Sequence, residues 1–290
     1  MRKTISRQEI SLTTLPLLWL ILFFLIPTLV VVAIAFKPAD TYGNILSGWT
    51  LETFRHLLSP GYLIILWRTL WISLLSTAIC LAIAIPVGYT IARAKPRWQK
   101  LLLLSVVIPF WSSLIVRIFA WKSLLHPEGL LKNWLVNLHL VSEDAVLLYH
   151  SWTVILVAVD SLLPFAILPI YSAAAKFNYQ LIEAAQDLGL SKLRAFMKIF
   201  IPSIKQGILT AAMMVFIPIF GAYIIPDMVG GPASEMLGNK IVQKTFMERN
   251  IPEASGLTLV LIAALLIPLL IICLIQARMV KSEVALRGIE

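Results

Sequence analysis

Long apolar runs without charged side chains alternate with short polar segments along the whole chain. A helix that crosses a bilayer needs about 20 consecutive apolar residues. Five runs contain no Asp, Glu, Lys or Arg, and they cover Leu12–Phe36, Thr69–Ala92, Leu101–Val116, Gln206–Pro226 and Ala254–Ala277. A sixth run, Ala145–Ala175, is interrupted only by Asp160. The third run is short and is expected to continue past Arg117 to about Leu125, so the pattern predicts six membrane-spanning helices.

Composition supports an all-α polytopic membrane protein and excludes a soluble one. Hydrophobic residues make up 59% of the 290 residues, charged residues only 13%, and the mean hydropathy is +0.89. A soluble protein of this composition would expose large apolar patches. No polar segment is long enough for a separate soluble domain, so the net charge of +9 does not indicate a nucleic-acid partner.

The residues that hold metals or perform catalysis are too scattered to form a site. Cys80 and Cys273 each lie inside an apolar run, which favours two buried side chains over a disulfide or a metal site. The four histidines show no ligand spacing; they are His56, His126, His139 and His150. We therefore predict no metal, no cofactor and no enzymatic activity in this chain.

Basic residues are distributed unequally between the two sides of the predicted membrane domain. The termini and the second and fourth connections carry 15 Lys and Arg, while the other three connections carry 7 together with nine of the fifteen acidic residues. Basic loops remain in the cytoplasm. We therefore expect cytoplasmic tails at 1–11 and 278–290, flanking a membrane domain at 12–277. The first run exceeds the 7–15 residues of a signal-peptide core, so a retained helix is expected.

The fourth connection, residues 176–205, has a helical pattern. Leu181, Ile182, Ala185 and Leu188 are spaced as one face of a short helix, and Gly189 follows in a C-cap position. Ser191 is placed to cap a second helix, whose apolar face is expected to comprise Leu193, Phe196, Met197 and Phe200. Two such helices must bury apolar faces, either in lipid headgroups or in a groove of a partner.

The residues of this loop resemble a known motif. Glu183-Ala184-Ala185, Gly189 four residues after Ala185, and Ile199-Phe200-Ile201-Pro202 are similar to the EAA loop in the membrane subunits of ATP-binding-cassette (ABC) importers. The only departure is Ile201 in place of leucine. The resemblance implies that the loop docks into a cleft on a cytoplasmic ATPase. Glu183 would then contact the ATPase, Ala184 and Ala185 would allow close packing, and Gly189 would form the turn.

The resemblance covers nearly the whole chain and narrows to the spermidine/putrescine branch of these permeases. It rests on Ile108-Pro109-Phe110-Trp111 before Arg117, Leu162-Leu163-Pro164-Phe165 before Pro169-Ile170-Tyr171, and Asp227-Met228-Val229-Gly230-Gly231 before Gly238-Asn239. It implies a type I ABC importer permease fold in the inner membrane. The implied partners are a dimer of ATP-binding subunits, a second homologous permease subunit and an extracytoplasmic solute-binding protein.

The chain itself lacks a recognisable ATP-binding motif. Gly43 and Gly48 have the spacing of a phosphate-binding loop, but Trp49-Thr50 follows where Lys and Ser or Thr are required. We interpret this segment as a turn. A separate subunit must therefore bind ATP, if transport is driven by ATP.

Asp160 is the sharpest candidate for the substrate pathway, because a carboxylate in mid-span is costly unless it faces a cavity or a partner. It would attract a cationic substrate, or it would form a structural ion pair with Arg117 or Arg68. Further pathway candidates are Trp111, Phe165 and Tyr223, as cation–π surfaces, and Asp227 at the outer end of the fifth span. Two other functions remain open: an ion-coupled secondary transporter with Asp160 as its relay, and a membrane scaffold that transports nothing.

Overall fold

The computed structural model describes residues 7–40 and 43–266, and within these ranges the secondary structure is helical apart from one isolated bridge between Ala39 and Ile45. The chain divides into two compact units. One is drawn from residues up to 63 and from 240 onward, and the other is residues 64–239. The tail at 278–290, Cys273 and the end of the predicted sixth span lie outside the described residues.

The first unit contains the two ends of the chain's described part. α1 (Arg7–Leu20), η1 (Ile21–Leu25) and α2 (Ile26–Ala35) follow one another without a break, and Thr14–Ala35 is apolar enough to cross a membrane. This confirms the first predicted span. α3 (Glu52–Leu57), η5 (Gln243–Met247) and an apolar helix over Ile251–Leu266 complete the unit. The last helix is the start of the predicted sixth span.

α4 (Pro60–Arg93) is the longest helix and contains the predicted second span. Its 34 residues correspond to about 51 Å at 1.5 Å per residue. The hydrocarbon core of a bilayer is only about 30 Å thick. The helix is therefore long enough to extend beyond the hydrocarbon region.

The third predicted span is not one continuous helix, and in this respect the prediction was wrong. α5 (Pro96–Val107) passes into a single 3₁₀ turn, η2 (Ile108–Trp111), and α6 (Leu114–Leu125) then starts in a new direction, with a bend of 89°. Pro109 lies in the 3₁₀ turn, where its missing N–H and fixed φ interrupt the α-helical hydrogen bonds. The end at Leu125 agrees with the prediction.

The fourth and fifth spans also differ from their predicted bounds. α8 (Ser151–Ala175) begins six residues later than the apolar run, yet it accommodates both Pro164 and Pro169 within one helix. α12 (Lys205–Phe220) ends at Gly221, and α13 (Ile224–Val229) follows as a separate short helix. Apart from the short helices of the loop at 176–205, the other elements are α7 (Leu130–Asn137), η4 (Pro232–Ser234) and α14 (Leu237–Val242), whose last three residues are assigned to the first unit.

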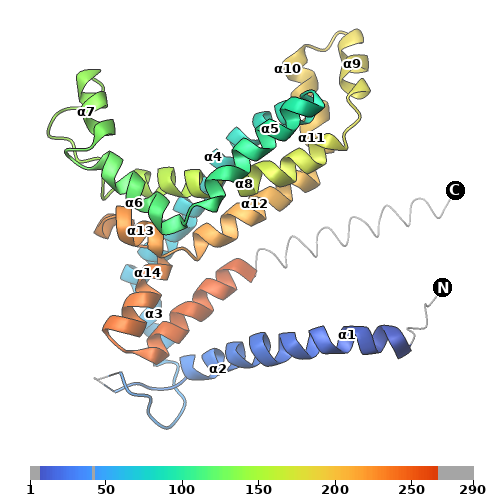
Figure 1. Cartoon of the computed structure of the whole chain (residues 1–290). Coiled ribbons are helices and arrows are strands. Elements are labelled where there is room, and N and C mark those ends of the chain that lie inside the picture. The colour runs from blue at the N-terminus through green and yellow to red at the C-terminus, as the bar shows by residue number, and fades with distance from the viewer. Residues whose placement is uncertain (1–6, 41–42, 267–290) are drawn as a thin grey trace. The chain divides into compact units, whose positions relative to one another are not determined.

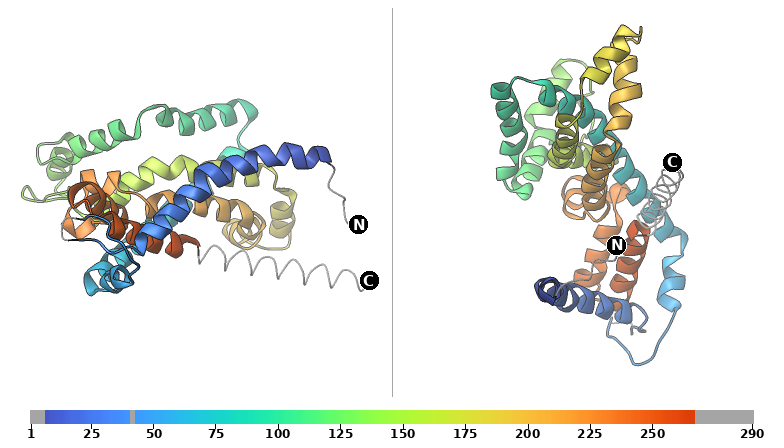
Figure 2. Two further views of the ribbon diagram at one scale, coloured as in Figure 1. Left: turned by 90° about the horizontal axis from the view of Figure 1, so that it is seen from below. Right: turned by 90° about the vertical axis from the view of Figure 1, so that its right-hand side faces the viewer.

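The core of the second unit is centred on α8, with α12 beside it in every view (Figures 1 and 2). Close approach depends on glycines: a Cβ at Gly207 of α12 would lie 2.5 Å from the Cβ of Ala173, and one at Gly88 of α4 would lie 2.8 Å from Ile170. Small residues allow membrane helices to approach closely. Cys80 is fully buried among these helices, as predicted.

Three described helices are long and apolar enough to cross a membrane, and two bent helix pairs raise that number to five. The helix that begins at Ile251 supplies the start of another. The all-α membrane architecture is confirmed, and the helix inventory is compatible with six spans.

Candidate functional site: the loop between α8 and α12 and the exposed face of α8

The loop that follows α8 turns sharply at Gly189. α9 (Gln180–Asp187) ends in a Schellman motif, in which the Gly189 N–H donates to the Gln186 carbonyl at 2.9 Å and the Leu190 N–H donates to the Ala185 carbonyl at 3.0 Å. The φ angle of Gly189 is +90°. No atom lies within 4 Å of where a Cβ would stand, so the backbone angle alone calls for glycine. The predicted C-cap is confirmed.

The second half of the loop is also helical. The Ser191 hydroxyl accepts a hydrogen bond from the Arg194 N–H at 3.4 Å, which confirms the predicted N-cap. The elements that follow are α10 (Lys192–Ala195), the π-helical η3 (Phe196–Phe200) and α11 (Ile201–Ser203). A bend of 73° then separates them from α12. Ile199 and Pro202 lie in the helical segment Lys192–Ser203, which projects beyond the ends of α8 and α12 (Figure 1).

Both short helices bury one side and expose apolar residues on another. The buried side comprises Ile182, Ala185, Ala195 and Phe200, while the exposed apolar residues are Leu181, Leu188, Leu193 and Met197. The chain itself therefore covers only part of the apolar face predicted for each helix, and the rest of that face is exposed. We call Leu181, Ala184, Leu188, Leu193 and Met197 the exposed apolar surface.

The two alanines of the motif have different surroundings. Ala185 is 7% exposed and belongs to the hydrophobic core of the chain, whereas Ala184 and Glu183 are exposed. Glu183 forms no ion pair or hydrogen bond through its carboxylate within the described residues. Its charge and the exposed apolar surface are thus available to a partner.

Five aromatic rings anchor the loop to the membrane helices, and they are Tyr89, Phe177, Tyr179, Phe196 and Phe200. Phe200 is fully buried at the centre, 4.8 Å from the Tyr89 ring and 5.2 Å from the Phe196 ring. Aromatic pairs contribute about 0.5–1.5 kcal/mol each beyond their buried area. Since Tyr89 belongs to α4, this aromatic cluster joins the loop directly to a long helix.

Asp160, on α8, has a partner that the sequence did not suggest. The Trp121 indole N–H of α6 donates to the Asp160 carboxylate at 2.9 Å. Within the described residues Asp160 forms no ion pair with Arg117 or Arg68, so those structural alternatives are not realised. Arg68 donates to the Pro232 carbonyl at 2.9 Å instead, and the Arg117 guanidinium lies over the Phe110 ring at 5.0 Å.

Asp160 lies on the exposed side of an otherwise well-buried helix. Trp152, Leu156 and Leu168, at four or eight positions from it, are exposed and apolar, while Pro164 is half-buried. A carboxylate cannot face hydrocarbon without a large penalty. In a bilayer, this stripe of α8 must therefore meet water or another protein surface at the level of Asp160.

The other pathway candidates lie near helix breaks or ends. Trp111 ends η2 and is 82% exposed, while Phe165 packs edge-on against Phe110 at 4.8 Å. Tyr223 lies between α12 and α13, and Asp227 is exposed on α13, which packs on α6 and α8. Within the described residues these four side chains and Asp160 form no hydrogen bond or ring contact with one another.

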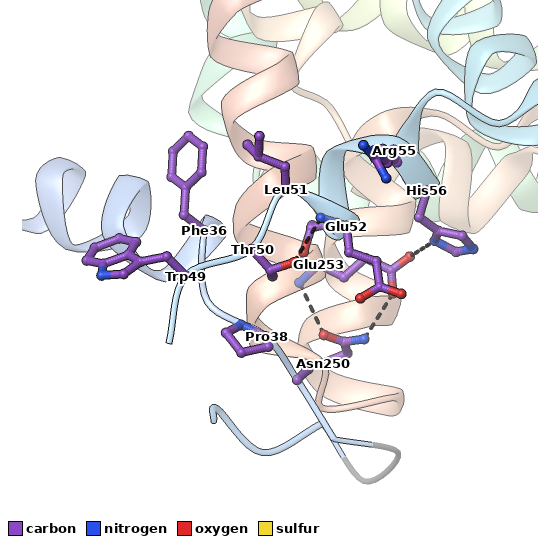
Figure 3. Close-up of a pocket in the computed structure, with 12 residues that line it drawn as sticks. Phe36, Pro38, Trp49, Thr50, Leu51, Glu52, Arg55, His56, Asn250 and Glu253 are labelled. Carbon is purple, nitrogen blue, oxygen red and sulfur yellow. Dashed lines mark hydrogen bonds and ion pairs between the residues drawn. The ribbon is translucent and has the colours of Figure 1, made fainter. Parts of the chain in front are cut away.

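A separate pocket of about 1190 Å³ lies in the first unit, between the segment after α2, α3 and the start of the helix at Ile251 (Figure 3). The Glu253 carboxylate beside it accepts hydrogen bonds from the Tyr62 hydroxyl at 2.5 Å and from Asn250 at 3.0 Å. His56 and Lys244 approach it to 3.1 and 3.0 Å. Burial alone would lower the pKa of the Lys244 amine, but hydrogen bonds to Glu248 and Glu253 shift it upward overall. Glu253 is thus satisfied within the chain.

Sequence reasoning missed Trp121 and the aromatic cluster. Trp121 is 39 positions from Asp160, so no local pattern joins them. The cluster had a weak signal, because four of its rings occur within the 24 residues from Phe177 to Phe200. Tyr89 gave none.

Comparisons with known proteins give a consistent result. The family model of binding-protein-dependent transport system inner membrane components matches residues 84–283. The spermidine/putrescine transport system permease protein PotB of Haemophilus influenzae is 35% identical over 251 residues, covering 86% of this chain and 88% of the relative. The protein of the same name from Escherichia coli K12 is 31% identical, covering 86% and 91%.

A solved structure shares the fold. The structure of a bacterial ABC transporter involved in the import of the acidic polysaccharide alginate aligns with a TM-score of 0.71, at 18% sequence identity, over 92% of this chain and 95% of that one. At this identity the likeness concerns the fold alone.

Proposed function

This chain belongs to the family of binding-protein-dependent transport system inner membrane components, and on that premise we propose that it forms half of the pathway by which an ABC importer takes up a polyamine or a related small organic cation. It is a multi-pass inner-membrane permease. The proposal extends this to its partners and substrate: a separate ATPase would drive transport by moving the loop at 176–205.

The observation that carries the proposal is the geometry of this loop. Gly189 forms the turn between α9 and α10. No other element of the described chain covers Glu183 or the exposed apolar surface. Exposed apolar residues around an unpaired charge are typical of a protein contact. Glu183, Ala184 and Gly189 would therefore contribute to docking, while Ala185, Ile199 and Pro202 would shape the loop from within.

The cationic substrate is proposed from two observations. The two relatives described above are named as spermidine/putrescine permeases, and Asp160 presents a carboxylate on the exposed side of α8. An ammonium group would be attracted to this carboxylate. Trp111, Phe165, Tyr223 and Asp227 are proposed to line the same pathway on either side of it.

The remaining partners follow from the family and from the distribution of basic residues. We propose cytoplasmic termini, which place the loop at 176–205 on the cytoplasmic side together with a dimer of ATP-binding subunits. A second, homologous permease would complete the pathway. A solute-binding protein would dock on the outer loops, as supported by a fold relative solved in complex with an alginate-bound periplasmic protein.

The test is a charge reversal in the loop, measured in the reconstituted importer. Glu183→Lys should abolish ATP-driven uptake of labelled spermidine or putrescine and weaken ATPase binding about a hundredfold, because it reverses the charge at a protein contact. Asp187→Lys, on the same helix but outside the motif, is the matched control and should bind the ATPase within about twofold of wild type.

Two results would overturn the proposal. One is unchanged ATPase binding and uptake in Glu183→Lys. The other is uptake that continues after ATP is depleted while a proton gradient is maintained, because an ion-coupled transporter would behave in that way.

A further inference from the structure

A small pocket opens where the end of α4 meets α9, beside the exposed apolar surface. Its volume is about 280 Å³, and the residues that line it include Arg93, Glu183 and Lys192 together with Tyr89 and Tyr179. Within the described residues none of the three charges forms an ion pair, although opposite charges line one cavity. The cavity therefore has charges to offer to a ligand.

Arg93 is held in place by aromatic residues rather than by an acid. Its guanidinium donates to the Tyr89 hydroxyl at 2.8 Å and lies over the rings of Tyr89 and Tyr179 at 5.5 and 5.6 Å. The Tyr179 hydroxyl in turn donates to the Ala174 carbonyl at 3.0 Å, which fixes the second ring. A guanidinium has five N–H donors, and Tyr89 is the single acceptor that it meets in the described chain.

We propose that Arg93 is a second attachment point for the ATPase subunit, and that an acidic side chain of that subunit enters the pocket and accepts two hydrogen bonds from its guanidinium. Lys192 strengthens the attraction, while Glu183, on the same wall, takes a basic residue of the same subunit. This inference rests on the proposed function, because it names the chemistry by which the ATPase is recognised at that site.

Charge complementarity favours a protein carboxylate over a small anion. A free phosphate or a lipid headgroup drawn to Arg93 would also meet the negative charge of Glu183 across the same small cavity. A protein surface avoids this repulsion, since it can present an acidic and a basic side chain side by side. Because the aromatic rings already fix the guanidinium, little conformational entropy is lost on binding, and planar two-point recognition of a carboxylate is what arginine provides.

Two contacts of opposite sign also determine orientation. A single contact at Glu183 would leave the ATPase free to rotate about it, whereas Arg93 and Glu183 belong to different helices, α4 and α9. Together they would define one docking angle. A force from the ATPase would then act on α4 as well as on the loop.

The first test is a titration of purified ATPase onto the full-length permease complex in lipid nanodiscs. Arg93→Gln should raise the Kd for the ATPase about tenfold, and Arg93→Lys should give an intermediate value because it keeps the charge but loses the planar fork. Arg97→Gln is the matched control, since this exposed arginine does not line the pocket. Its Kd should remain within about twofold of wild type.

The second test begins with Arg93 intact, so its first readout does not depend on how an Arg93 variant folds. A photoreactive benzoylphenylalanine replaces the pocket residue Gln186 (Gln186→benzoylphenylalanine), and the complex is irradiated in phospholipid nanodiscs containing anionic lipid. An adduct with the ATPase supports the inference, and adding Arg93→Gln should reduce its yield. An adduct with phospholipid alone overturns the inference.

The outcomes separate this inference from the proposed function. If Glu183→Lys loses ATPase binding while Arg93→Gln keeps it, the second attachment point is refuted and the docking loop stands. If both variants bind normally, the docking loop itself is refuted.

Discussion

Glu183 and Glu253 are two glutamates near the starts of helices, but their surroundings are opposite. Glu253 has four polar partners, His56, Tyr62, Lys244 and Asn250, and its side chain is only 10% exposed. Glu183 is exposed and its carboxylate has no partner in the described chain. A charge that is fully paired inside the chain stabilises the fold, whereas one left unpaired in a well-ordered setting is available for a partner.

The largest expected effect is on the free energy of unfolding, from removal of the paired glutamate. Glu253→Ala should lower it by about 3 kcal/mol, because the Tyr62 hydroxyl would lose its acceptor and the partly buried Lys244 would keep only the more exposed Glu248 as an acidic partner. Glu183→Ala should change it by less than about 0.5 kcal/mol. Chemical unfolding of the purified permease in detergent, followed by tryptophan fluorescence, measures both. Equal losses of unfolding free energy in the two variants would contradict the distinction between a paired, structural glutamate and an unpaired one.

The next effect concerns the turn that presents Glu183. Gly189→Ala should lower the free energy of unfolding by about 1–2 kcal/mol, because a residue with a side chain is strained at a φ angle of +90°. ATPase binding should weaken accordingly, by about tenfold. Gly61→Ala is the matched control: Gly61 lies in α4 with no atom within 4 Å of its would-be Cβ, so alanine there should be neutral or stabilising. If the two glycine variants bind the ATPase alike, the turn is not what presents the loop.

A third variant tests whether the exposed Asp160 carboxylate in α8 contributes to substrate transport. Asp160→Asn should lower kcat/KM for spermidine uptake about tenfold, since the charge is lost while the amide oxygen still accepts from Trp121. Stability should be unchanged, in contrast to Glu253→Ala. Asp144→Asn, in an exposed loop, is the control. Normal uptake kinetics in Asp160→Asn would return this residue to a structural role.

The smallest effect is expected at the rim of the Glu253 network. Glu248 pairs with Lys244 at 2.6 Å, but its side chain is 41% exposed. Glu248→Gln should therefore cost no more than about 0.5 kcal/mol of unfolding free energy, as is typical of exposed ion pairs. A loss near that of Glu253→Ala, measured in the same unfolding experiment, would show that exposure does not rank these two acids.

Features that depend on neighbouring residues in the chain were predictable, and features that depend on packing between helices were not. Gly189 and Ser191 were assigned correctly because a C-cap and an N-cap are set by local backbone angles and bonds across three to five residues. The three long apolar helices, Thr14–Ala35, Pro60–Arg93 and Ser151–Ala175, were found because the bilayer sets the length of a spanning helix.

Two of the failures share one physical cause. Which side of α9 is buried, and that Trp121 reaches Asp160, are decided by the rotation of each helix against its neighbours. Hydrophobicity alone does not fix that rotation in a chain that is apolar on every side. The break after Val107 was likewise missed, since α8 shows that proline inside a helix need not interrupt it.

The tight contact between Gly207 and Ala173 has a mechanical consequence. The loop at 176–205 begins at the end of α8 and ends at the start of α12, and these two helices leave no room for a methyl group between them at this point. Close-packed surfaces resist compression and shear. We therefore expect a force applied to the loop to move both helices together, and the Asp160 carboxylate of α8 with them.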